Sequence, residues 1–313
     1  MSDLARRVLR GDIRAAARLM RDLDDGVPAA QAVLRRLYTR AGRAHVVGIT
    51  GPPGSGKSTL ADVLVASARG QGLGVGVVAV DPTSHITGGA VLGDRIRMQR
   101  HARDKDVFIR SLATRGSLGG LSRSVFDTVT VLDAMGKDLI LVETAGVGQD
   151  GVKVAGAAHT VLVVLAPGMG DEVQVLKAGI LEIGDIYVVN KCDRGGAEPL
   201  AQSLRLALDT GSRPDGWQRP VVKTAAVSGT GVARLWDLIR DHRAALESSG
   251  AWERRSGAMA RAAFLELMEA GFKELLSEKL KREKPLQKLW EDLACRRKDP
   301  YSVARQALRE LWP

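Results

Sequence analysis

Short apolar runs alternate with longer amphipathic segments from His45 to about Leu238. This alternation is typical of βαβ units around a mainly parallel sheet, because strands buried on both faces are apolar throughout while crossover helices have one apolar face. We predict strands at 45–50, 75–80, 107–110, 138–143, 160–165, 185–190 and 220–224. Helices are predicted to follow Lys57 and to occupy about 118–135, 172–181, 197–209 and 231–247. The fold class is α/β, with helices flanking the sheet.

The two ends of the chain have helical patterns only. Residues 4–40 carry apolar positions at helical spacing among many arginines, which predicts two or three amphipathic helices that pack on the following domain. After about residue 248 the strand signals stop, and one broad face of a helical stretch carries Phe264, Leu267, Met268, Phe272, Leu275 and Leu276. Such a face needs a partner surface, either its own domain or a second subunit. We therefore divide the chain into an N-terminal helical extension (1–44), a central domain (45–247) and a C-terminal helical region (248–313), with a dimerisation arm as one interpretation.

Composition narrows the classes of function. The net charge is +10, but both signs are mixed along the whole chain without a long basic block, and aromatic residues are only 4%. We therefore expect no nucleic-acid face. The two cysteines, Cys192 and Cys295, are too few for a disulfide framework and are expected to be buried or half-buried thiols in a reducing cytoplasm. No signal peptide or long apolar run is evident, so we expect a cytoplasmic protein without a membrane span.

The first chemical motif follows the strand at 45–50. Gly51-Pro52-Pro53-Gly54-Ser55-Gly56-Lys57-Ser58 has the spacing G-x-x-x-x-G-K-S and leads, through Thr59, into an amphipathic helix. Glycines let backbone N–H groups turn toward phosphate oxygens, and the helix N-terminus adds a positive dipole end. Lys57 would bridge the β- and γ-phosphates and the Ser58 hydroxyl would ligate Mg²⁺. The alternative is a chance glycine turn, which would not require the lysine and the hydroxyl at these places.

The second motif selects the base. Asn190-Lys191-Cys192-Asp193 follows a predicted strand and has the N-K-x-D spacing of guanine-specific P-loop proteins. The Asp193 carboxylate can accept hydrogen bonds from guanine N1–H and the 2-amino group, which adenine does not offer. Asn190 would brace the pocket and the stem of Lys191 would cover one face of the base. A later strand end, Thr224-Ala225-Ala226, could present a backbone N–H to guanine O6.

Two carboxylates close other predicted strands. Asp81 and Glu143 stand at strand ends, and the carboxyl edge of an open α/β sheet is where such folds bind ligands. Each could instead be a helix N-cap or a partner in a loop salt bridge.

Further segments resemble one family. Asp81 to Ser84, Thr87 to Arg95, Arg115 to Gly120, Glu143 to Gln149 and Asn190 to Asp193 are together similar to the MeaB/ArgK/MMAA family. These are P-loop GTPases of the metallochaperone group that chaperone adenosylcobalamin-dependent acyl-CoA mutases. The resemblance runs from about Arg10 to Ala307. Departures such as Thr83, and Ala145 in place of a frequent valine, remove no phosphate or metal contact and leave the particular mutase open.

The resemblance implies roles for residues that the spacing alone does not assign. Asp81, Asp94 and Glu143 would surround Mg²⁺ directly or through water. The loop around Asp94 would be switch I, and Glu143 to Asp150 switch II, with the Gly146 backbone sensing the γ-phosphate. Pro167 to Gln174 would form a further mobile segment that communicates with the mutase, although a plain connection from a loop to a helix would have the same sequence pattern. Gln149 could orient water or make a structural hydrogen bond.

The residues described above allow three possible functions to be compared. The leading hypothesis is a homodimeric GTPase that cycles between GTP and GDP with Mg²⁺. It would gate cofactor loading or protection of an adenosylcobalamin-dependent acyl-CoA mutase, with a cobalamin adenosyltransferase as a further candidate partner. A metabolite or protein kinase would need a positioned base beside the phosphate loop, and the sequence offers none. A nickel-delivery GTPase would need a His or Cys cluster, whereas the five histidines are scattered.

Overall fold

The computed structural model describes residues 2–81, 98–113, 123–144, 146, 153–168, 180–208, 216–282 and 284–311. The described chain divides into two compact units, residues 1–262 and 263–313. The first unit contains a seven-stranded sheet, and the second is helical. The predicted α/β fold class is confirmed.

The sheet is parallel at each of its six strand pairings, in the order β3-β2-β4-β1-β5-β6-β7. Its strands are β1 (His45–Thr50), β2 (Val75–Asp81), β3 (Val107–Ala113), β4 (Leu139–Thr144), β5 (Thr160–Leu165), β6 (Ile186–Val189) and β7 (Val221–Lys223). Each lies where the apolar pattern predicted a strand. β1 occupies the middle of the sheet, between β4 and β5, so the loop that follows it opens at the centre of the carboxyl edge.

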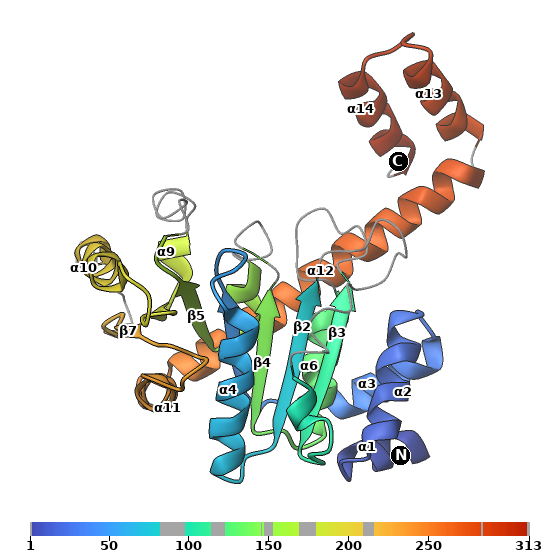
Figure 1. Ribbon diagram of the computed structural model, residues 1–313. Helices are drawn as coiled ribbons and strands as arrows, with labels where there is room; N and C mark the ends of the chain where they lie inside the picture. Colours follow the sequence, from blue (N-terminus) through green and yellow to red (C-terminus); the bar gives the residue numbers. More distant parts are fainter. Residues whose placement is uncertain are drawn as a thin grey trace. The chain divides into compact units, whose positions relative to one another are not determined.

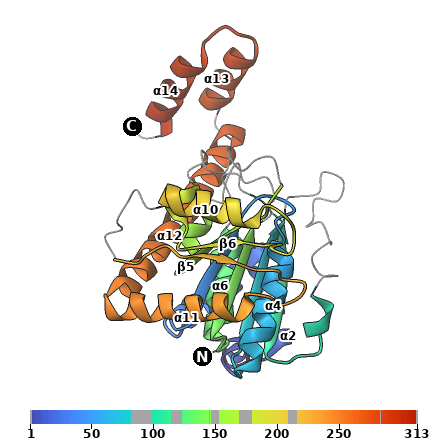
Figure 2. The ribbon, with the colours of Figure 1, turned by 60° about the vertical axis from the view of Figure 1, so that its left-hand side comes forward.

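Helices cover both faces of the sheet (Figure 1). α4 (Lys57–Gly70) and α11 (Val232–Ser248) pack on one face, where the core includes Ile49, Leu64 and Ile239. α6 (Arg123–Ala134) packs on the other face, together with the N-terminal helices and α10 (Ala197–Leu208), and that core includes Ile140 and Leu132. Figure 2 shows α10 and α11 beside the β6–β7 end of the sheet. Side chains alternate between the two cores along each strand, as the strand period of two requires.

The N-terminal segment forms three helices, α1 (Asp3–Leu9), α2 (Ile13–Asp24) and α3 (Pro28–Tyr38). Their buried residues belong to the same core as α6, which confirms that they pack on the domain that follows. Asp12 caps α2 by accepting the N–H of Ala15. The Asp133 carboxylate of α6 accepts the N–H groups of Gly42, Arg43 and Ala44, and so anchors the link into β1.

One predicted strand is longer than its apolar run. β3 continues past the predicted end at Arg110, through Ser111 to Ala113, and is paired with β2 as far as Asp81. The apolar run does not indicate this extension, because the polar residues Arg110 and Ser111 interrupt it. In the fold Arg110 forms an ion pair with Asp24 of α2, so its charge is compensated where the N-terminal helices cover the sheet.

Other predicted elements are shorter or fall partly outside the described residues. The helix predicted at 118–135 is described as Arg123–Ala134, and of the helix predicted at 172–181 only α9 (Ile180–Ile183) is described. Two short 3-10 helices lie at Gln99–His101 (η1) and Val154–Ala157 (η2). The expectation of a buried or half-buried thiol holds for Cys192 but is wrong for Cys295, which is exposed in the short connection after α13.

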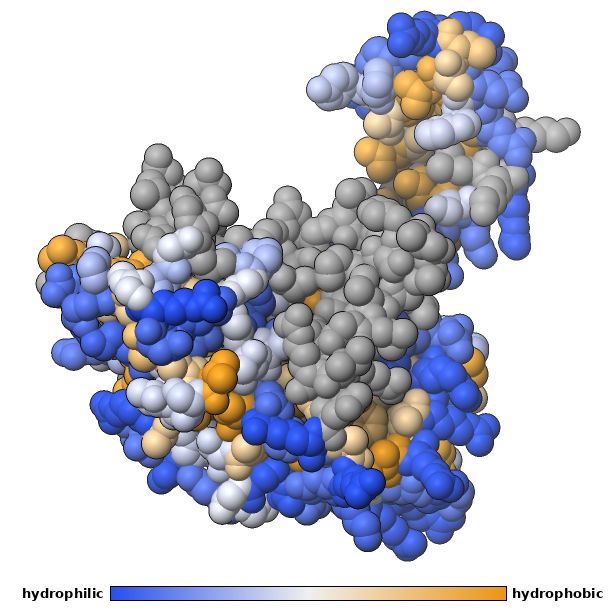
Figure 3. Space-filling view, viewed as in Figure 1, coloured by the Kyte–Doolittle hydropathy of each residue, from blue (hydrophilic) through white to orange (hydrophobic). Residues whose placement is uncertain are grey.

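The C-terminal region is helical, with α12 (Ala251–Arg282), α13 (Lys284–Ala294) and α14 (Pro300–Leu311). α13 and α14 form a hairpin around a small core of Leu286, Leu289 and Val303. Figure 3 shows apolar side chains gathered on the visible face of this hairpin. The predicted apolar positions of α12 are largely exposed in the single chain, at Phe264, Leu267, Met268, Phe272 and Leu275. Within the described parts of the chain, none of the helices is long and apolar enough to span a membrane.

Candidate nucleotide site

The predicted phosphate loop connects the end of β1 to the start of α4. Gly51, Gly54 and Gly56 all have positive φ angles, at 148°, 79° and 91°. A Cβ at Gly51 would lie 2.0 Å from the carbonyl oxygen of Val164, so only glycine lets the loop pass this close to β5. Lys57 folds back over the loop, and its Nζ donates to the carbonyl oxygens of Gly51 (2.9 Å) and Pro52 (3.1 Å).

The start of α4 has the features of an anion site. The first N–H groups of a helix have no acceptor within the helix, and no side chain caps α4 at Gly56. The Ser55 hydroxyl is buried and has no hydrogen-bond partner within the described residues. Buried polar groups normally have a partner, so this hydroxyl indicates that the loop is built for a further polar group. Phosphate oxygens fit these donors and the nearby Lys57 ammonium.

Two of the predicted metal ligands are in contact. Ser58 begins α4 and Glu143 lies near the end of β4, and the Ser58 hydroxyl donates to Glu143 Oε1 at 2.7 Å. Both side chains are buried. A hydroxyl and a carboxylate supply the hard oxygen donors that Mg²⁺ prefers, so this pair fits a magnesium ion. Asp81 ends β2 at the same edge of the sheet, whereas Asp94 lies outside the described residues.

Asn190 joins three segments that are far apart in the sequence. Its Nδ2 donates to the carbonyl oxygen of Ser55 in the phosphate loop at 2.9 Å. Its Oδ1 accepts from the Thr224 hydroxyl and from the N–H of Ala226, both at 3.1 Å. The side chain is buried, so each contact is made away from water. The predicted base loop is thus fixed directly to the predicted phosphate loop.

The rest of the N-K-x-D motif turns outward from this brace. Lys191 adopts a left-handed conformation (φ 57°), and its Nζ donates to the carbonyl oxygen of Gly54 at 2.6 Å. The next N–H, of Cys192, donates to the Thr224 carbonyl at 2.9 Å. Asp193 is exposed beyond this turn. A carboxylate in this position remains accessible to a base that enters beside Lys191.

The N–H groups of the Thr224-Ala225-Ala226 segment donate within the protein. Their acceptors are the Val189 carbonyl, the Thr230 carbonyl and Asn190 Oδ1, at 2.9, 3.0 and 3.1 Å. The role of this segment as a donor to guanine O6 stays a prediction. In the single chain, the hydrogen bonds of this segment hold it against Val189, Thr230 and Asn190.

Two threonines beside the motifs were not singled out from the sequence. The Thr144 hydroxyl lies 3.2 Å from the Gly146 carbonyl oxygen, and the Thr50 hydroxyl lies 3.4 Å from the same atom. They come from the ends of β4 and β1, and both side chains are fully buried. In the sequence, only their positions could have drawn attention to them. Thr144 directly follows Glu143, and Thr50 directly precedes Gly51. Of the predicted switch II, the structure describes Glu143, Thr144 and Gly146, and Gln149 lies outside the described residues.

A glycine-rich loop before a helix, joined through a buried asparagine to an N-K-x-D loop at the carboxyl edge of a parallel sheet, defines a P-loop GTPase. The family model described as methylmalonyl Co-A mutase-associated GTPase MeaB matches residues 17–283. The chain belongs to this family.

Known relatives agree with this membership. A Pyrococcus abyssi protein named as a candidate GTPase is 53% identical over 253 residues, which cover 80% of this chain and 78% of the relative. The GTPase ArgK of Escherichia coli is 34% identical over 258 residues, covering 80% and 78%. The mouse protein named methylmalonic aciduria type A homolog, mitochondrial, is 36% identical over 211 residues, which cover 65% of this chain and 50% of the mouse protein.

Solved structures support the fold. A crystal structure of an LAO/AO transport system kinase aligns with a TM-score of 0.72 and 23% identity, covering 99% of this chain and 97% of that one. HypB from Helicobacter pylori, solved in complex with nickel, aligns with a TM-score of 0.50 and 17% identity over 68% of this chain and 93% of its own. At these identities the likeness concerns the fold alone. Within the described residues there is no group of three or more His, Cys, Asp or Glu side chains placed to hold a metal ion.

Proposed function

We propose that this chain is a GTP-hydrolysing chaperone whose nucleotide state controls the loading, protection or reactivation of an adenosylcobalamin-dependent acyl-CoA mutase, such as methylmalonyl-CoA mutase. The observation that carries the proposal is the match of residues 17–283 to a family described as mutase-associated GTPases. The proposed setting is the cytoplasm, with a homodimer as the working unit and a cobalamin adenosyltransferase as a further candidate partner.

Each element of the site has a proposed task in this cycle. The loop from Gly51 to Thr59 would bind the phosphates, with Lys57 placing its charge near the β- and γ-oxygens. Ser58 and Glu143, with Asp81 and Asp94, would hold Mg²⁺, which neutralises charge on the phosphates when it is bound. Gly146 lies two residues after the end of the strand that contains Glu143. Loss of the γ-phosphate would release its backbone and so alter the surface that a partner reads.

The base is the first point to test. Exchanging Asp193→Asn replaces an acceptor carboxylate by an amide that offers one acceptor and one donor, so guanine N1–H and its amino group lose a shared partner. We expect the affinity for GDP to fall by about 100-fold or more, as for other sites built around a polar group of the ligand. Titration with a fluorescent GDP analogue measures this. Asp237→Asn, on the exposed surface of α11, is the matched control and is expected to bind like the wild type.

The client is tested by GTP turnover with and without purified methylmalonyl-CoA mutase. We expect turnover to rise by about tenfold or more with the mutase, a modest fraction of the acceleration that partner proteins give other GTPases. Turnover that no adenosylcobalamin-dependent mutase of the source organism changes would refute the chaperone proposal. Transfer of γ-phosphate label to a protein or metabolite, faster than phosphate release, would instead support a kinase.

A further inference from the structure

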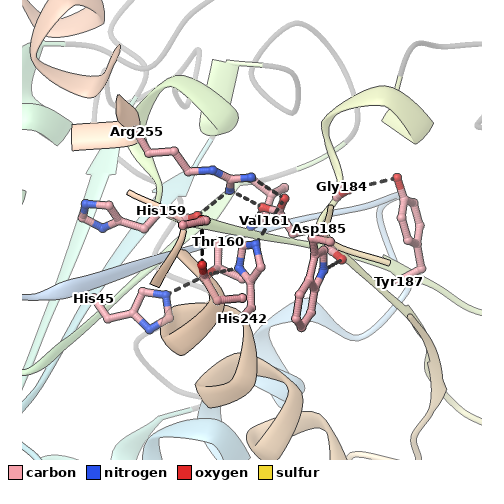
Figure 4. Close-up of polar contacts among 12 residues, drawn as sticks. His45, His159, Thr160, Val161, Gly184, Asp185, Tyr187, His242 and Arg255 are labelled. Atoms are coloured by element: carbon pink, nitrogen blue, oxygen red, sulfur yellow. Dashed lines mark hydrogen bonds and ion pairs between the residues drawn. The ribbon is translucent and has the colours of Figure 1, made fainter. Parts of the chain in front are cut away.

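A second polar cluster lies at the opposite edge of the sheet from the nucleotide site. Side chains from the starts of β1 and β5, the turn before β6, α11 and the first turns of α12 converge there (Figure 4). We call this group the amino-edge cluster, and its members are His45, His159, Thr160, Asp185, His242, Trp252 and Arg255. The proposed GTPase cycle uses none of them.

An ion pair forms the centre of the cluster. Arg255 of α12 makes a bidentate contact with Asp185, with distances of 2.7 Å (Nη1 to Oδ2) and 2.8 Å (Nη2 to Oδ1). Asp185 is fully buried and also accepts the N–H of Val161 at 2.8 Å. The same guanidinium donates to the His159 carbonyl oxygen at 2.5 Å. Planar bidentate pairs of this kind fix orientation as well as charge, so Arg255 holds α12 against both β5 and β6.

Neighbouring contacts hold the same helix turn. The Trp252 ring stacks on His159 with 3.9 Å between ring centroids and 7° between planes, and His159 Nε2 lies 3.2 Å from the Ser256 hydroxyl. The Thr160 hydroxyl lies between His45 Nε2 (2.7 Å) and His242 Nδ1 (2.8 Å). All three of these residues are buried. The start of α12 is therefore attached to the sheet by a network whose polar members are paired with one another.

The strand β6 connects this network to the nucleotide site. Asp185 directly precedes β6 and Asn190 directly follows it, and the four residues between them, Ile186–Val189, are fully buried. A strand of this length rises only about 13 Å, so it acts as a short rigid link. At one end it is fixed to α12 through Asp185, and at the other it is fixed to the phosphate loop through Asn190.

We propose that the Asp185–Arg255 pair is a positioning contact that couples the guanine loop to the start of α12 through β6. When the pair is intact, the register of β6 and the place of Asn190 are fixed from both ends. A shift of α12 at Arg255 therefore changes guanine-nucleotide affinity, and by reciprocity nucleotide binding changes the order of the first turns of α12. Because α12 continues to Arg282 with exposed apolar residues, the pair would make nucleotide release sensitive to whatever binds that helix.

The inference rests on the proposed nucleotide site and is tested in the full-length protein with a fluorescent GDP analogue. Removing one partner alone leaves a buried charge uncompensated, so the main variant is the double exchange Asp185→Asn/Arg255→Gln. We expect this variant to release GDP about fivefold faster or more, at the lower end of coupling factors between sites. Arg255→Lys keeps the charge but loses the bidentate contact, and we expect an intermediate rate.

The matched control is Asp24→Asn/Arg110→Gln. This pair is also largely buried and also ties a helix to a strand of the sheet, but the strand is β3, at the edge away from β6. We expect the control to lose a similar amount in unfolding temperature while its GDP release stays within twofold of the wild type. This comparison separates coupling from general destabilisation.

Hydrogen exchange provides the second readout. In the wild type, GDP should increase the protection of residues 251–262 by about threefold or more, and in the double variant this gain should be lost. Unchanged release together with an unchanged GDP-dependent gain in the variants would overturn the inference. If the double variant does not fold, GDP release and GDP-dependent protection are measured on the Arg255→Lys variant and judged by the same criteria. Failure of the wild type to bind GDP at all would instead reject the proposed nucleotide site.

Discussion

Single buried polar residues determine how this protein holds its loops and helices. Asn190 uses both ends of its amide, one toward the phosphate loop and one toward the Thr224–Ala226 segment. His159 has a comparable place at the other edge, where its Nδ1 accepts the N–H of Val46 at 3.1 Å. An acceptor nitrogen cannot carry a proton, so this hydrogen bond requires an unprotonated Nδ1. Protonation of His159 would also place a cation beside Arg255, whose own charge is already paired with Asp185.

The His159 ring predicts a dependence of stability on pH. Burial, followed by the charges of Arg255 and Arg243, lowers the pKa of His159 from 6.5 to about 4 in the folded protein. The unfolded chain therefore binds a proton first as the pH falls, so stability is full above pH 6.5 and declines between pH 6.5 and 4. The expected loss is about 2 kcal/mol by pH 5 and about 3 kcal/mol once both states are protonated.

The exchange His159→Asn isolates this effect, because the Asn Oδ1 can accept the Val46 N–H but does not titrate. We expect the unfolding free energy of this variant, measured with urea from pH 7.5 to 5, to fall less steeply than that of the wild type. Burial also lowers the pKa of His45 well below its usual value, so the variant should keep a residual slope of the same sign. Parallel curves for the two proteins would contradict the assignment to His159.

At the scale of elements, the connection between β7 and α11 depends on two glycines with left-handed backbones. Gly229 and Gly231 have φ angles of 79° and 74°. A Cβ at Gly231 would lie 2.1 Å from the carbonyl oxygen of Lys223, whereas a Cβ at Gly229 would meet nothing within 4 Å. Gly231 also stands at the N-cap of α11. The turn thus lies so close to β7 that there is room for a side chain at Gly229 but not at Gly231.

These two glycines form a matched pair for mutation. Gly229→Ala should cost about 1–2 kcal/mol, the usual cost of a left-handed backbone for a residue with a Cβ. Gly231→Ala adds a backbone collision that cannot be relieved by rotating a side chain, so we expect a loss above about 3 kcal/mol or failure to fold. Urea unfolding of the two variants measures the difference, and equal losses would show that the loop moves freely away from Lys223.

At the scale of the whole molecule, the exposed apolar residues of α12 predict self-association. We call Phe264, Leu267, Met268, Phe272 and Leu275 the α12 stripe, and each is more than a third exposed in the single chain. At 100° per residue they fall within one broad side of the helix. Contiguous apolar surface of this kind marks an interface, and a second copy is the proposed occupant.

The exchange Phe264→Glu/Met268→Glu places two charges one turn apart on the α12 stripe. We expect sedimentation to give a dimer for the wild type and a monomer for this variant, because an interface does not bury unpaired carboxylates without a large cost. Lys273→Gln is the control, since Lys273 lies on the opposite side of the helix from Phe264. A monomeric wild type, or a variant that remains dimeric, would reject the α12 stripe as the interface.

The sequence by itself determined the strands and the phosphate loop, because both depend on the residue types within a short segment of the chain. Apolar runs specified the strands, since a buried parallel strand must be apolar on both faces, and the glycine spacing specified a loop that only glycine can follow. The N-K-x-D motif and Glu143 were located by their places at strand ends. The sequence did not determine the distances between these residues, because strands that are neighbours in the sheet are far apart in the chain.

Tertiary structure alone decided the contacts that join distant segments. The charge of Arg110 in β3 is compensated by Asp24, which belongs to a helix far earlier in the chain. The Asn190 brace likewise exists only because β6 lies beside β7 and the loop after β1 reaches the same edge of the sheet. The Asp185–Arg255 pair exists only because α12 returns to the amino ends of β5 and β6. Side-chain type shows that a group can donate, accept or carry charge, but the partner of that group follows from strand order and helix packing, which local sequence does not encode.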